Sequence, residues 1–273
     1  MSLYLNGVAL VIGAGSGIGR ECVLGYAGEG VRSIVLADID YDAALDAAQE
    51  SETVATNPAF KALPVRVDVT DPKSVDSMVK RTARMFGRID YCVNGAGCDV
   101  VVTGTLNCIQ AIVPVMRNQS VGIYKARGRT RETSRGTIIN VASHSPFVLT
   151  PQMPQNTTTK HAVLGADVYT ISGGTALENA PHGIRINAVC PGWVESPTPD
   201  CNENASRPHM VETMIPMSRT AKPEEIADVV LFLSSPRSSY VTGAAWLVDG
   251  GMALQASTVM NGAPQLETSC TPS

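Results

Sequence analysis

The sequence has few aromatic residues, no surplus of basic residues and no long apolar run. Phe, Trp and Tyr make up 5% of the 273 residues, and 21 Lys and Arg stand against 25 Asp and Glu, giving a net charge of −4. Binding nucleic acid through charge needs a basic surplus, so we expect no nucleic-acid partner. No apolar run reaches the ~18 residues of a membrane span, and Met1 to Leu5 lack the pattern of a signal peptide. We therefore expect a cytoplasmic protein without a membrane partner.

The cysteines lack the spacing of a metal site or a disulfide framework. Seven are present, an odd number, and no two form a Cys-x-x-Cys pair. Several fall in apolar runs, where a free thiol behaves as a small apolar side chain. We expect buried free thiols and no metal among Cys22, Cys92, Cys98, Cys108, Cys190, Cys201 and Cys270.

What is present is an alternation of short apolar runs with helix-compatible segments. Apolar residues make up 44% of the chain, enough for the core of one α/β domain. The pattern predicts strands over 8–12, 33–36, 65–67, 89–93, 137–141 and 184–189, and helices over 21–27, 41–52 and 72–85, the last with Asp71 near its N-cap. Alternating β and α segments favour a parallel sheet covered on both faces.

Two segments stand apart from this alternation. Residues 117–135 hold six basic residues and one acid, which is typical of a solvated loop; a cap that attracts an anionic group is the alternative. The last residues, 256–273, are rich in Ser, Thr, Pro and Gly and are expected to form a flexible tail after a domain of residues 1–255.

A glycine-rich turn follows the first predicted strand. In Gly13-Ala-Gly15-Ser-Gly17-Ile-Gly19, glycines allow a tight turn and let backbone N–H groups approach a pyrophosphate at a helix N-terminus. Asp38 ends the second strand, nineteen residues after Gly19, where a carboxylate can accept both ribose hydroxyls. A carboxylate there repels a 2′-phosphate, so the pattern favours NAD(H), while NADP(H) stays open.

From about residue 5 to 254 the chain resembles the short-chain dehydrogenase/reductase family, which implies a single Rossmann-type doubly wound domain. Besides the glycine turn, Asp68-Val69, Asn94-Gly-Ala-Gly97 and Pro191-Gly192-Trp-Val194-Glu-Ser196 resemble its cofactor-contacting motifs, and 241–251 resemble its last strand. The cofactor-binding residues that this resemblance implies are Gly13, Ser16, Gly17, Ile18, Gly19, Asp38, Ile39, Asp68, Val69, Asn94, Ala96, Gly97, Lys160, Pro191, Gly192, Val194 and Ser196.

The catalytic motif of that family is incomplete in this chain. Ser143 and Lys160 match the family Ser and Lys, but Asn156 stands four residues before Lys160, where the family has its Tyr acid/base. An amide cannot exchange a proton at neutral pH as a tuned phenol can. Val101 occupies the expected place of the helix Asn, and six residues separate Gly97 from Gly104, fewer than the family normally has. One wall of the substrate pocket is therefore expected to be rebuilt.

Beyond Gly165 the chain exceeds the family spacing by about a turn and a half of helix. If the helix continues, Asn156, Lys160 and Asp167 lie within ~40° of each other, with Lys160 and Asp167 ~10 Å apart along the axis. Direct pairing then needs a distorted helix, which Gly173-Gly174 would favour.

These departures lead to a hypothesis about the reaction. Reducing a ketone gives an alkoxide that needs a proton, whereas an iminium accepts hydride and becomes a neutral amine. The chain resembles divergent fungal alkaloid-pathway members that lack the Tyr, reduce such a species and hold the product for an intramolecular [4+2] cyclisation. That resemblance implies secondary metabolism, a small-molecule substrate, and catalytic roles for Asp167 at the cationic centre, Arg131 at a carbonyl or carboxylate, Ser143 at the substrate and Lys160 at the ribose.

Three alternatives remain at this point. A ketone or alcohol oxidoreductase with an acid relocated to His144 or Tyr169 is the first, and a redox-silent cyclase or isomerase is the second. A non-enzymatic NAD(H)-binding scaffold is the third. Family members often associate as tetramers through the helix that carries Lys160, and the insertion after it leaves a homo-oligomer open.

Overall fold

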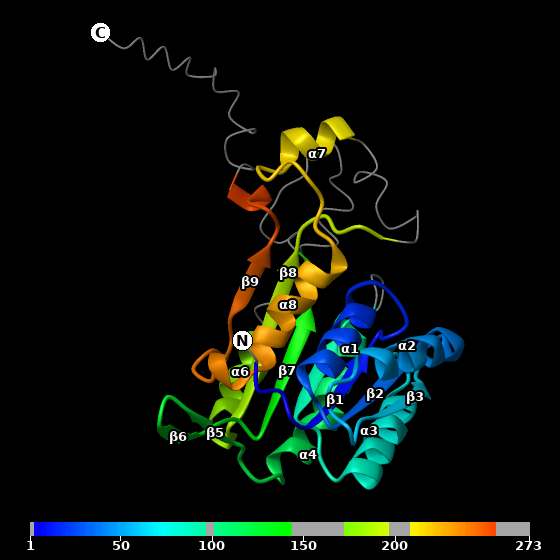
Figure 1. The fold of residues 1–273 in the computed structure, drawn as a ribbon, viewed down its shortest axis with the longest axis vertical. Coiled ribbons are helices and arrows are strands. Elements are labelled where there is room, and N and C mark those ends of the chain that lie inside the picture. Colours follow the sequence, from blue (N-terminus) through cyan, green and yellow to red (C-terminus); the bar gives the residue numbers. More distant parts are fainter. Residues whose placement is uncertain (1–2, 97–100, 144–171, 197–207, 255–273) are drawn as a thin grey trace.

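A computed structural model describes residues 3–96, 101–143, 172–196 and 208–254 (Figure 1). Its strands are β1 (Val8–Ile12), β2 (Ser33–Asp38), β3 (Lys61–Arg66), β4 (Tyr91–Asn94), β5 (Ile123–Ala126), β6 (Arg129–Glu132), β7 (Gly136–Val141), β8 (Ile184–Pro191) and β9 (Ala245–Val248). Its helices are α1 (Gly17–Glu29), α2 (Tyr41–Val54), α3 (Pro72–Phe86), α4 (Val101–Arg117), α6 (Thr175–Asn179), α7 (Pro208–Met214) and α8 (Pro223–Ser234), with short 3-10 turns η3 (Ala180–His182) and η5 (Pro236–Ser238).

Seven strands form one sheet in the order β3-β2-β1-β4-β7-β8-β9, and every neighbouring pair is parallel. The chain moves outward from β1 to β3 on one side and then returns to place β4 on the other side of β1. This is the doubly wound α/β architecture that the alternating pattern predicts. A cleft outside the carboxyl ends of the strands is expected where the order reverses, next to β1.

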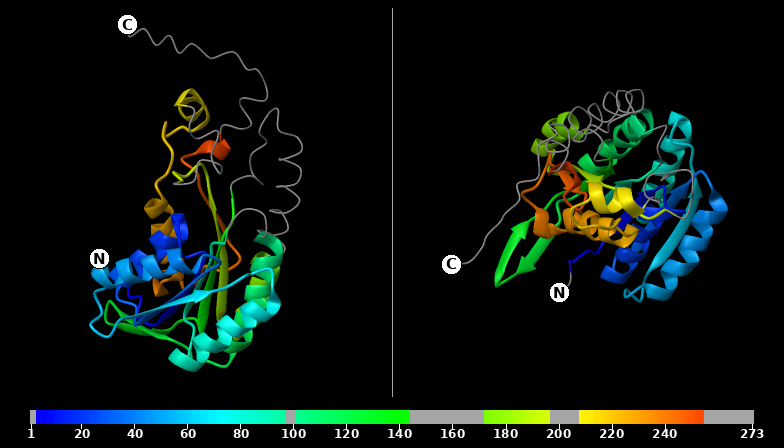
Figure 2. Two further views of the ribbon diagram at one scale, coloured as in Figure 1. Left: turned by 90° about the vertical axis from the view of Figure 1, so that its right-hand side faces the viewer. Right: turned by 90° about the horizontal axis from the view of Figure 1, so that it is seen from above.

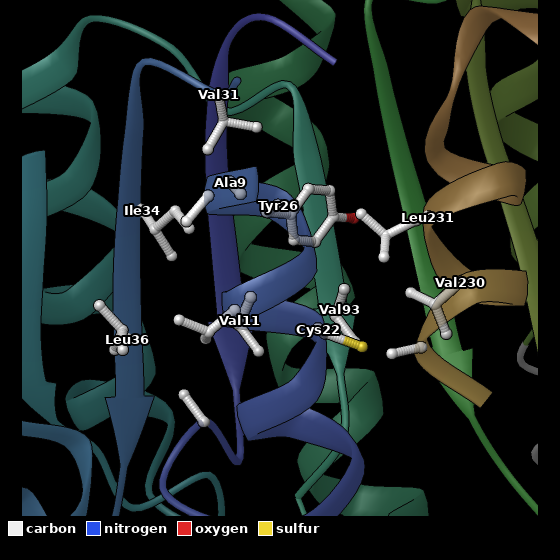
Figure 3. Packing of buried hydrophobic residues seen from close by; sticks show 14 of the residues in the cluster. Ala9, Val11, Cys22, Tyr26, Val31, Ile34, Leu36, Val93, Val230 and Leu231 are labelled. Atoms are coloured by element: carbon white, nitrogen blue, oxygen red, sulfur yellow. The ribbon is translucent and has the colours of Figure 1, made fainter. Parts of the chain in front are cut away.

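Helices cover both faces of the sheet, as Figure 2 shows when the sheet is viewed edge-on. One buried cluster joins the sheet to α1, α2 and α8, and the other joins it to α3, α4 and α6. In Figure 3, Cys22 and Tyr26 of α1 face Val11 and Ala9 of β1, with Leu231 of α8 beside them. Strands enclosed on both faces carry nearly continuous apolar runs, which is why all five residues of β1 are buried.

The sequence predicted the strands of the main sheet, but the bounds of several elements differ from those expected, among them β3 and β4. The strand expected over 65–67 is β3, which begins at Lys61 and contains Pro64. Proline is tolerated because β3 is an edge strand, where one side of the backbone has no ladder partner. The strand expected over 89–93 is β4, which begins two residues later at Tyr91.

The basic segment between α4 and β7 is a β-hairpin, not the loop that its charge suggested. β5 and β6 pair antiparallel and are joined by Arg127 and Gly128 alone. Both residues have positive φ, 54° and 69°, which is the backbone of the tight two-residue turns that match strand twist. The hairpin is a separate two-stranded sheet at the end of the molecule where the main strands begin (Figure 1).

Candidate functional site

The glycine turn between β1 and α1 forms the centre of the candidate site. Gly13 has φ +80°, and a Cβ atom built there would lie 2.6 Å from the carbonyl oxygen of Gly95. A Cβ atom on Gly19 would lie 1.9 Å from the carbonyl oxygen of Gly13. Side chains at either position would collide with backbone, so the close approach of β1, α1 and the end of β4 requires glycine.

Helix α1 begins at this turn without a side-chain cap. Ser16 is its N-cap residue with extended backbone, but its side chain makes no capping hydrogen bond. The first N–H groups of a helix have no partner within the helix and carry partial positive charge. A Cβ atom on Gly17 would meet nothing within 4 Å, so the space in front of the turn is open. The turn therefore fits a pyrophosphate, with Ile18 in the first turn of the helix.

Asp38 lies beside the same turn at the end of β2. Its Oδ2 accepts a hydrogen bond from the Gly15 N–H at 2.8 Å, and its Oδ1 accepts one from the Asp40 N–H at 3.1 Å. The carboxylate is half-buried, whereas the side chain of the following residue, Ile39, is 62% exposed. Each carboxylate oxygen retains acceptor capacity, which suits a pair of ribose hydroxyls.

Asp68 and Val69 follow β3 at the same edge. The Asp68 carboxylate accepts hydrogen bonds from the Thr70 hydroxyl at 2.6 Å and from the Thr70 N–H at 2.9 Å. These two bonds hold the pKa of the Asp68 carboxyl below its usual value, so it is ionised at neutral pH. Val69 lines a small cavity with Asn94 and Ala96, which places the Asp68-Val69 and Asn94-Gly-Ala motifs side by side.

A buried amide bridge ties the ends of β4 and β7 together. Asn94 Nδ2 donates to Asn140 Oδ1 at 2.7 Å, and Asn140 Nδ2 donates to Ser172 Oγ at 2.8 Å. All three side chains are at least 95% buried. The Asn94 amide nitrogen therefore donates its hydrogen bond within the protein, to Asn140. Sequence reasoning did not single out Asn140 or Ser172, because a polar residue inside an apolar strand gives no sign of its partner.

Ser172 belongs to a short π-helical stretch, residues 172–174, that precedes α6. The sequence suggested that Gly173-Gly174 would distort the helix, and these residues do depart from α-helical hydrogen bonding. Single π turns of this kind interrupt α-helices frequently at functional sites. Here the turn brings the Ser172 hydroxyl onto Asn140 of β7.

The residues after β7 and β8 lie at the same carboxyl edge of the sheet, on the other side of β4 from the glycine turn. Ser143 follows β7 and is half-buried, and its neighbour Ala142 donates its N–H to Val189 of β8 at 2.8 Å. Pro191 ends β8, and Gly192 passes so close to Asp249 that a Cβ atom would lie 2.8 Å from the Asp249 Cα. Val194 then pairs with Ala221, and Ser196 ends this described segment.

Several predicted residues lie outside the described part of the chain. They are Gly97, His144, Asn156, Lys160, Asp167 and Tyr169, together with the tail 256–273. The geometry of the predicted Lys160 and Asp167 pair is therefore not described. Among the described motif residues, Asp38 bonds the glycine turn, and Val69, Asn94 and Ala96 line one small cavity.

Arg131 is not brought to this edge. It lies on β6 at the opposite end of the sheet, where its Nη2 donates to the Pro236 carbonyl at 2.7 Å and its guanidinium lies 5.0 Å from the Tyr124 ring centroid. This position contradicts the role of Arg131 at a substrate carbonyl that the sequence led us to expect. The segment is basic, but the hairpin turns it away from the carboxyl ends of the strands.

The described cysteines are buried free thiols, as predicted. Cys22, Cys92, Cys108 and Cys190 are buried and form no disulfide with one another. Burial raises the pKa of the Cys108 thiol to about 12, and desolvation raises the pKa of Cys22 and Cys92 as well. The thiols of Cys22, Cys92 and Cys108 are therefore protonated at neutral pH. In the described residues, no helix is long and apolar enough to cross a membrane.

Comparison with known proteins gives the same result as the geometry. A family model described as enoyl-(acyl carrier protein) reductase matches residues 13–253. The chain is 51% identical over 280 residues to the short-chain dehydrogenase anuF of Penicillium roqueforti, covering 94% of this chain and 100% of that protein. It is 38% identical over 274 residues to the short-chain dehydrogenase fogB of Aspergillus ruber, covering 92% and 98%.

A solved structure supports the assignment at the level of the fold. The crystal structure of a short-chain type dehydrogenase/reductase from Mycobacterium marinum superposes with a TM-score of 0.78 at 32% identity. The match covers 92% of this chain and 97% of that one.

Proposed function

Because this chain belongs to the short-chain dehydrogenase/reductase family and is an NAD(P)-dependent oxidoreductase of that type, we propose that it uses NADH to reduce an iminium or a similarly activated C=N or C=C bond. The observation that carries the cofactor half of this proposal is the glycine turn with Asp38 bonded to Gly15 N–H at 2.8 Å. When bound, NADH supplies the hydride from its nicotinamide ring.

The residues of the edge would hold the cofactor in a fixed order. The turn from Gly13 to Gly19 faces the pyrophosphate, Asp38 accepts from the adenosine ribose, and Asp68-Val69 lie next to the adenine. Gly192 to Ser196, after β8, lie on the nicotinamide side, and Lys160 holds the second ribose. The negative charge of Asp38 disfavours a 2′-phosphate, which supports NADH over NADPH.

We propose an activated bond as the substrate because the described part of the site offers few groups that could donate a proton. Residues 136–143 and 184–196, which cover the described ends of β7 and β8, contain neither Tyr nor His, and Asn156 stands where the family has its Tyr. A ketone oxygen would need a proton as hydride arrives, whereas the carbon of an iminium takes the hydride and its nitrogen becomes neutral. Ser143 then orients the substrate, and Asp167 stabilises the cationic centre by its charge.

No residue in the described part of the chain supports the [4+2] cyclisation expected from the fungal resemblance. It remains a prediction from the sequence, as does a place in secondary metabolism.

The experiment compares two benzo-fused bicyclic substrates of similar size. The full chain is given NADH with either the N-methyl-3,4-dihydroisoquinolinium ion or 2-tetralone, and NADH consumption is followed. We expect turnover of the iminium and turnover of the ketone slower by about 10² or more, the usual contribution of a positioned acid. Equal rates would contradict the proposal and favour a relocated acid, which His144→Phe and Tyr169→Phe would then identify. NADH binding without consumption of either compound would favour the scaffold or the redox-silent enzyme.

A further inference from the structure

A second cleft lies at the opposite end of the sheet from the glycine turn. Its volume is about 910 Å³, and its walls come from the chain before β1, the residues around the start of β4, and the hairpin strand β5. Gly7 precedes β1 and Asp90 precedes β4, so the cleft opens where the strands begin. None of the residues proposed for the cofactor lines it. This volume is in the range of metabolite-binding pockets, roughly 300–1,000 Å³.

Positive charge dominates the lining of this cleft. Arg32, Arg88 and Lys125 line it, and Asp90 is the acidic residue in the lining. Asp90 is already engaged, because it pairs with Arg88 at 2.6 Å and accepts the Val8 N–H at 2.9 Å. Arg32 donates to the Phe86 carbonyl at 3.2 Å, and neither Arg32 nor Lys125 forms an ion pair with any described residue. Two cations therefore face the cleft without a carboxylate partner.

A third cation lies buried behind the wall. The Arg185 side chain is 94% buried and donates to the carbonyls of Ser234 and Ser235 and to the Thr137 hydroxyl, without a carboxylate partner among the described residues. Its Nε has no hydrogen-bond partner. Ser234 itself lines the cleft, so this charge acts on the cleft through protein of low dielectric. Such walls focus the field into the cleft and increase its attraction for anions.

Ring contacts hold the hairpin wall in place. Tyr4 has φ +58°, an uncommon backbone conformation for a bulky residue, and its ring meets the Tyr124 ring edge-on at 5.2 Å. Arg131 covers the Tyr124 ring and donates a hydrogen bond to the Pro236 carbonyl, which joins β6 to η5. A strained residue persists only where its surroundings fix it, and here those surroundings form the cleft. The cations are therefore presented by a preformed wall.

We propose that this cleft is a second ligand site of the protein, which binds a small multivalent anion carrying carboxylate or phosphate groups. Arg32 comes from the turn before β2 and Lys125 from the hairpin, so an anion with at least two separated charged groups can meet both. The site lies away from the glycine turn, so the protein can hold the anion and the dinucleotide at the same time.

The test is calorimetric titration of the full chain with citrate or pyrophosphate at constant ionic strength, in the presence of excess NADH. The NADH keeps pyrophosphate from the glycine turn. We expect saturable binding of at least one anion. Tighter binding of citrate would identify carboxylates as the ligand class, and tighter binding of pyrophosphate would identify phosphates. Because one charge-assisted contact is lost, Lys125→Gln and Arg32→Gln should each weaken binding by about tenfold. Both side chains are exposed, so the variants are expected to fold.

Arg129→Gln is the matched control, since Arg129 is an exposed cation of the same hairpin that does not line the cleft. It should leave the anion affinity unchanged. Two outcomes would overturn the proposal: no saturable binding of either anion in the presence of NADH, or an equal loss of affinity in Arg129→Gln. The variant comparison stands whether or not the chain reduces an iminium.

Discussion

At the scale of single residues, Asp38 carries two tasks. Its Oδ2 accepts the Gly15 N–H at 2.8 Å and so helps to shape the turn, while its negative charge faces the region proposed for the adenosine ribose. Asparagine keeps an acceptor oxygen for Gly15 and removes the charge. The two tasks can therefore be separated by one substitution.

We predict that Asp38→Asn reduces the preference for NADH over NADPH by about tenfold, because a charged hydrogen bond to the ribose and the repulsion of a 2′-phosphate are both lost. Dissociation constants for both dinucleotides, measured by fluorescence titration, check this. Asp68→Asn serves as a control, since it also removes a carboxylate at this edge but not one beside the ribose. An unchanged NADH:NADPH ratio in Asp38→Asn would refute the assignment.

The residue scale also shows where sequence reasoning stops. Asp38 could be predicted because it ends a strand at a fixed distance from the glycine turn, and that spacing is local. The bond from Asn140 to Ser172 joins residues 32 positions apart, and nothing in either neighbourhood indicates the other. Arg185 is similar, because its partners come from β7, the end of α8 and the segment before β9.

At the scale of elements, the start of α8 is held by a charged pair. Glu225 accepts from Arg219 through both oxygens, at 2.7 and 2.6 Å, and also accepts the Lys222 N–H at 2.9 Å. The Arg219 hydrogen bonds, followed by that from Lys222, lower the pKa of the Glu225 carboxyl from 4.5 to about 2. A carboxylate near a helix N-terminus also interacts favourably with the helix dipole.

This pair gives the stability a defined pH dependence. Because the pKa of Glu225 is lower in the folded state, its contribution is fully present above 4.5 and is lost as the pH falls towards about 2. We predict that Glu225→Gln lowers the free energy of unfolding at neutral pH, and that the difference from wild type shrinks across that window. Urea unfolding at several pH values measures it. A constant difference, or an equal loss in the neighbouring variant Glu224→Gln, would contradict the prediction.

The hairpin was missed as an element for a physical reason. Charge and polarity made residues 117–135 resemble a solvated loop, and β6 is in fact exposed at all four positions. What forms the hairpin is the turn at Arg127-Gly128, where glycine takes positive φ without strain and the pairing register follows. A two-residue turn ending in Gly between short alternating segments was the local signal available.

At the scale of the whole molecule, the main sheet and the hairpin are independent structures. β5 and β6 pair with each other and with no strand of the seven-stranded sheet. Thr133 N–H donates to the Gly122 carbonyl at 2.8 Å, so the two ends of the hairpin lie close together. A short linker can therefore replace it.

We predict that replacing residues 123–132 with two glycines leaves the sheet intact. The loss of the Arg131 hydrogen bond and of the Tyr4–Tyr124 contact should cost about 1–3 kcal/mol in the free energy of unfolding. Circular dichroism and urea unfolding check the fold, and NADH binding should be unchanged. Binding of citrate or pyrophosphate at the second cleft should disappear. Loss of helical signal in this variant would show that the hairpin is needed for the fold.

The alternation of strands and helices was sufficient to predict the parallel sheet and the helices that cover both of its faces. The end of the sheet where strands begin could not be predicted in the same way. Tyr4 of the segment before β1, Arg32 of the turn before β2 and Lys125 of the hairpin all line the cleft there. Such segments vary in direction and length. Which of them come into contact depends on side-chain packing and not on a repeating sequence pattern.

The parallel pairing of all seven strands also determines how the chain folds. Ala9 of β1 pairs with Tyr91 of β4, 82 residues later (91 − 9), and no two strands of this sheet are joined by a tight turn. Contacts so distant along the chain make folding slow, because loop-closure entropy is lost before the contacts form. During synthesis, β1 has one open edge until β4 has left the ribosome. Until then the nascent chain exposes an apolar strand with an unpaired edge, which is prone to aggregate.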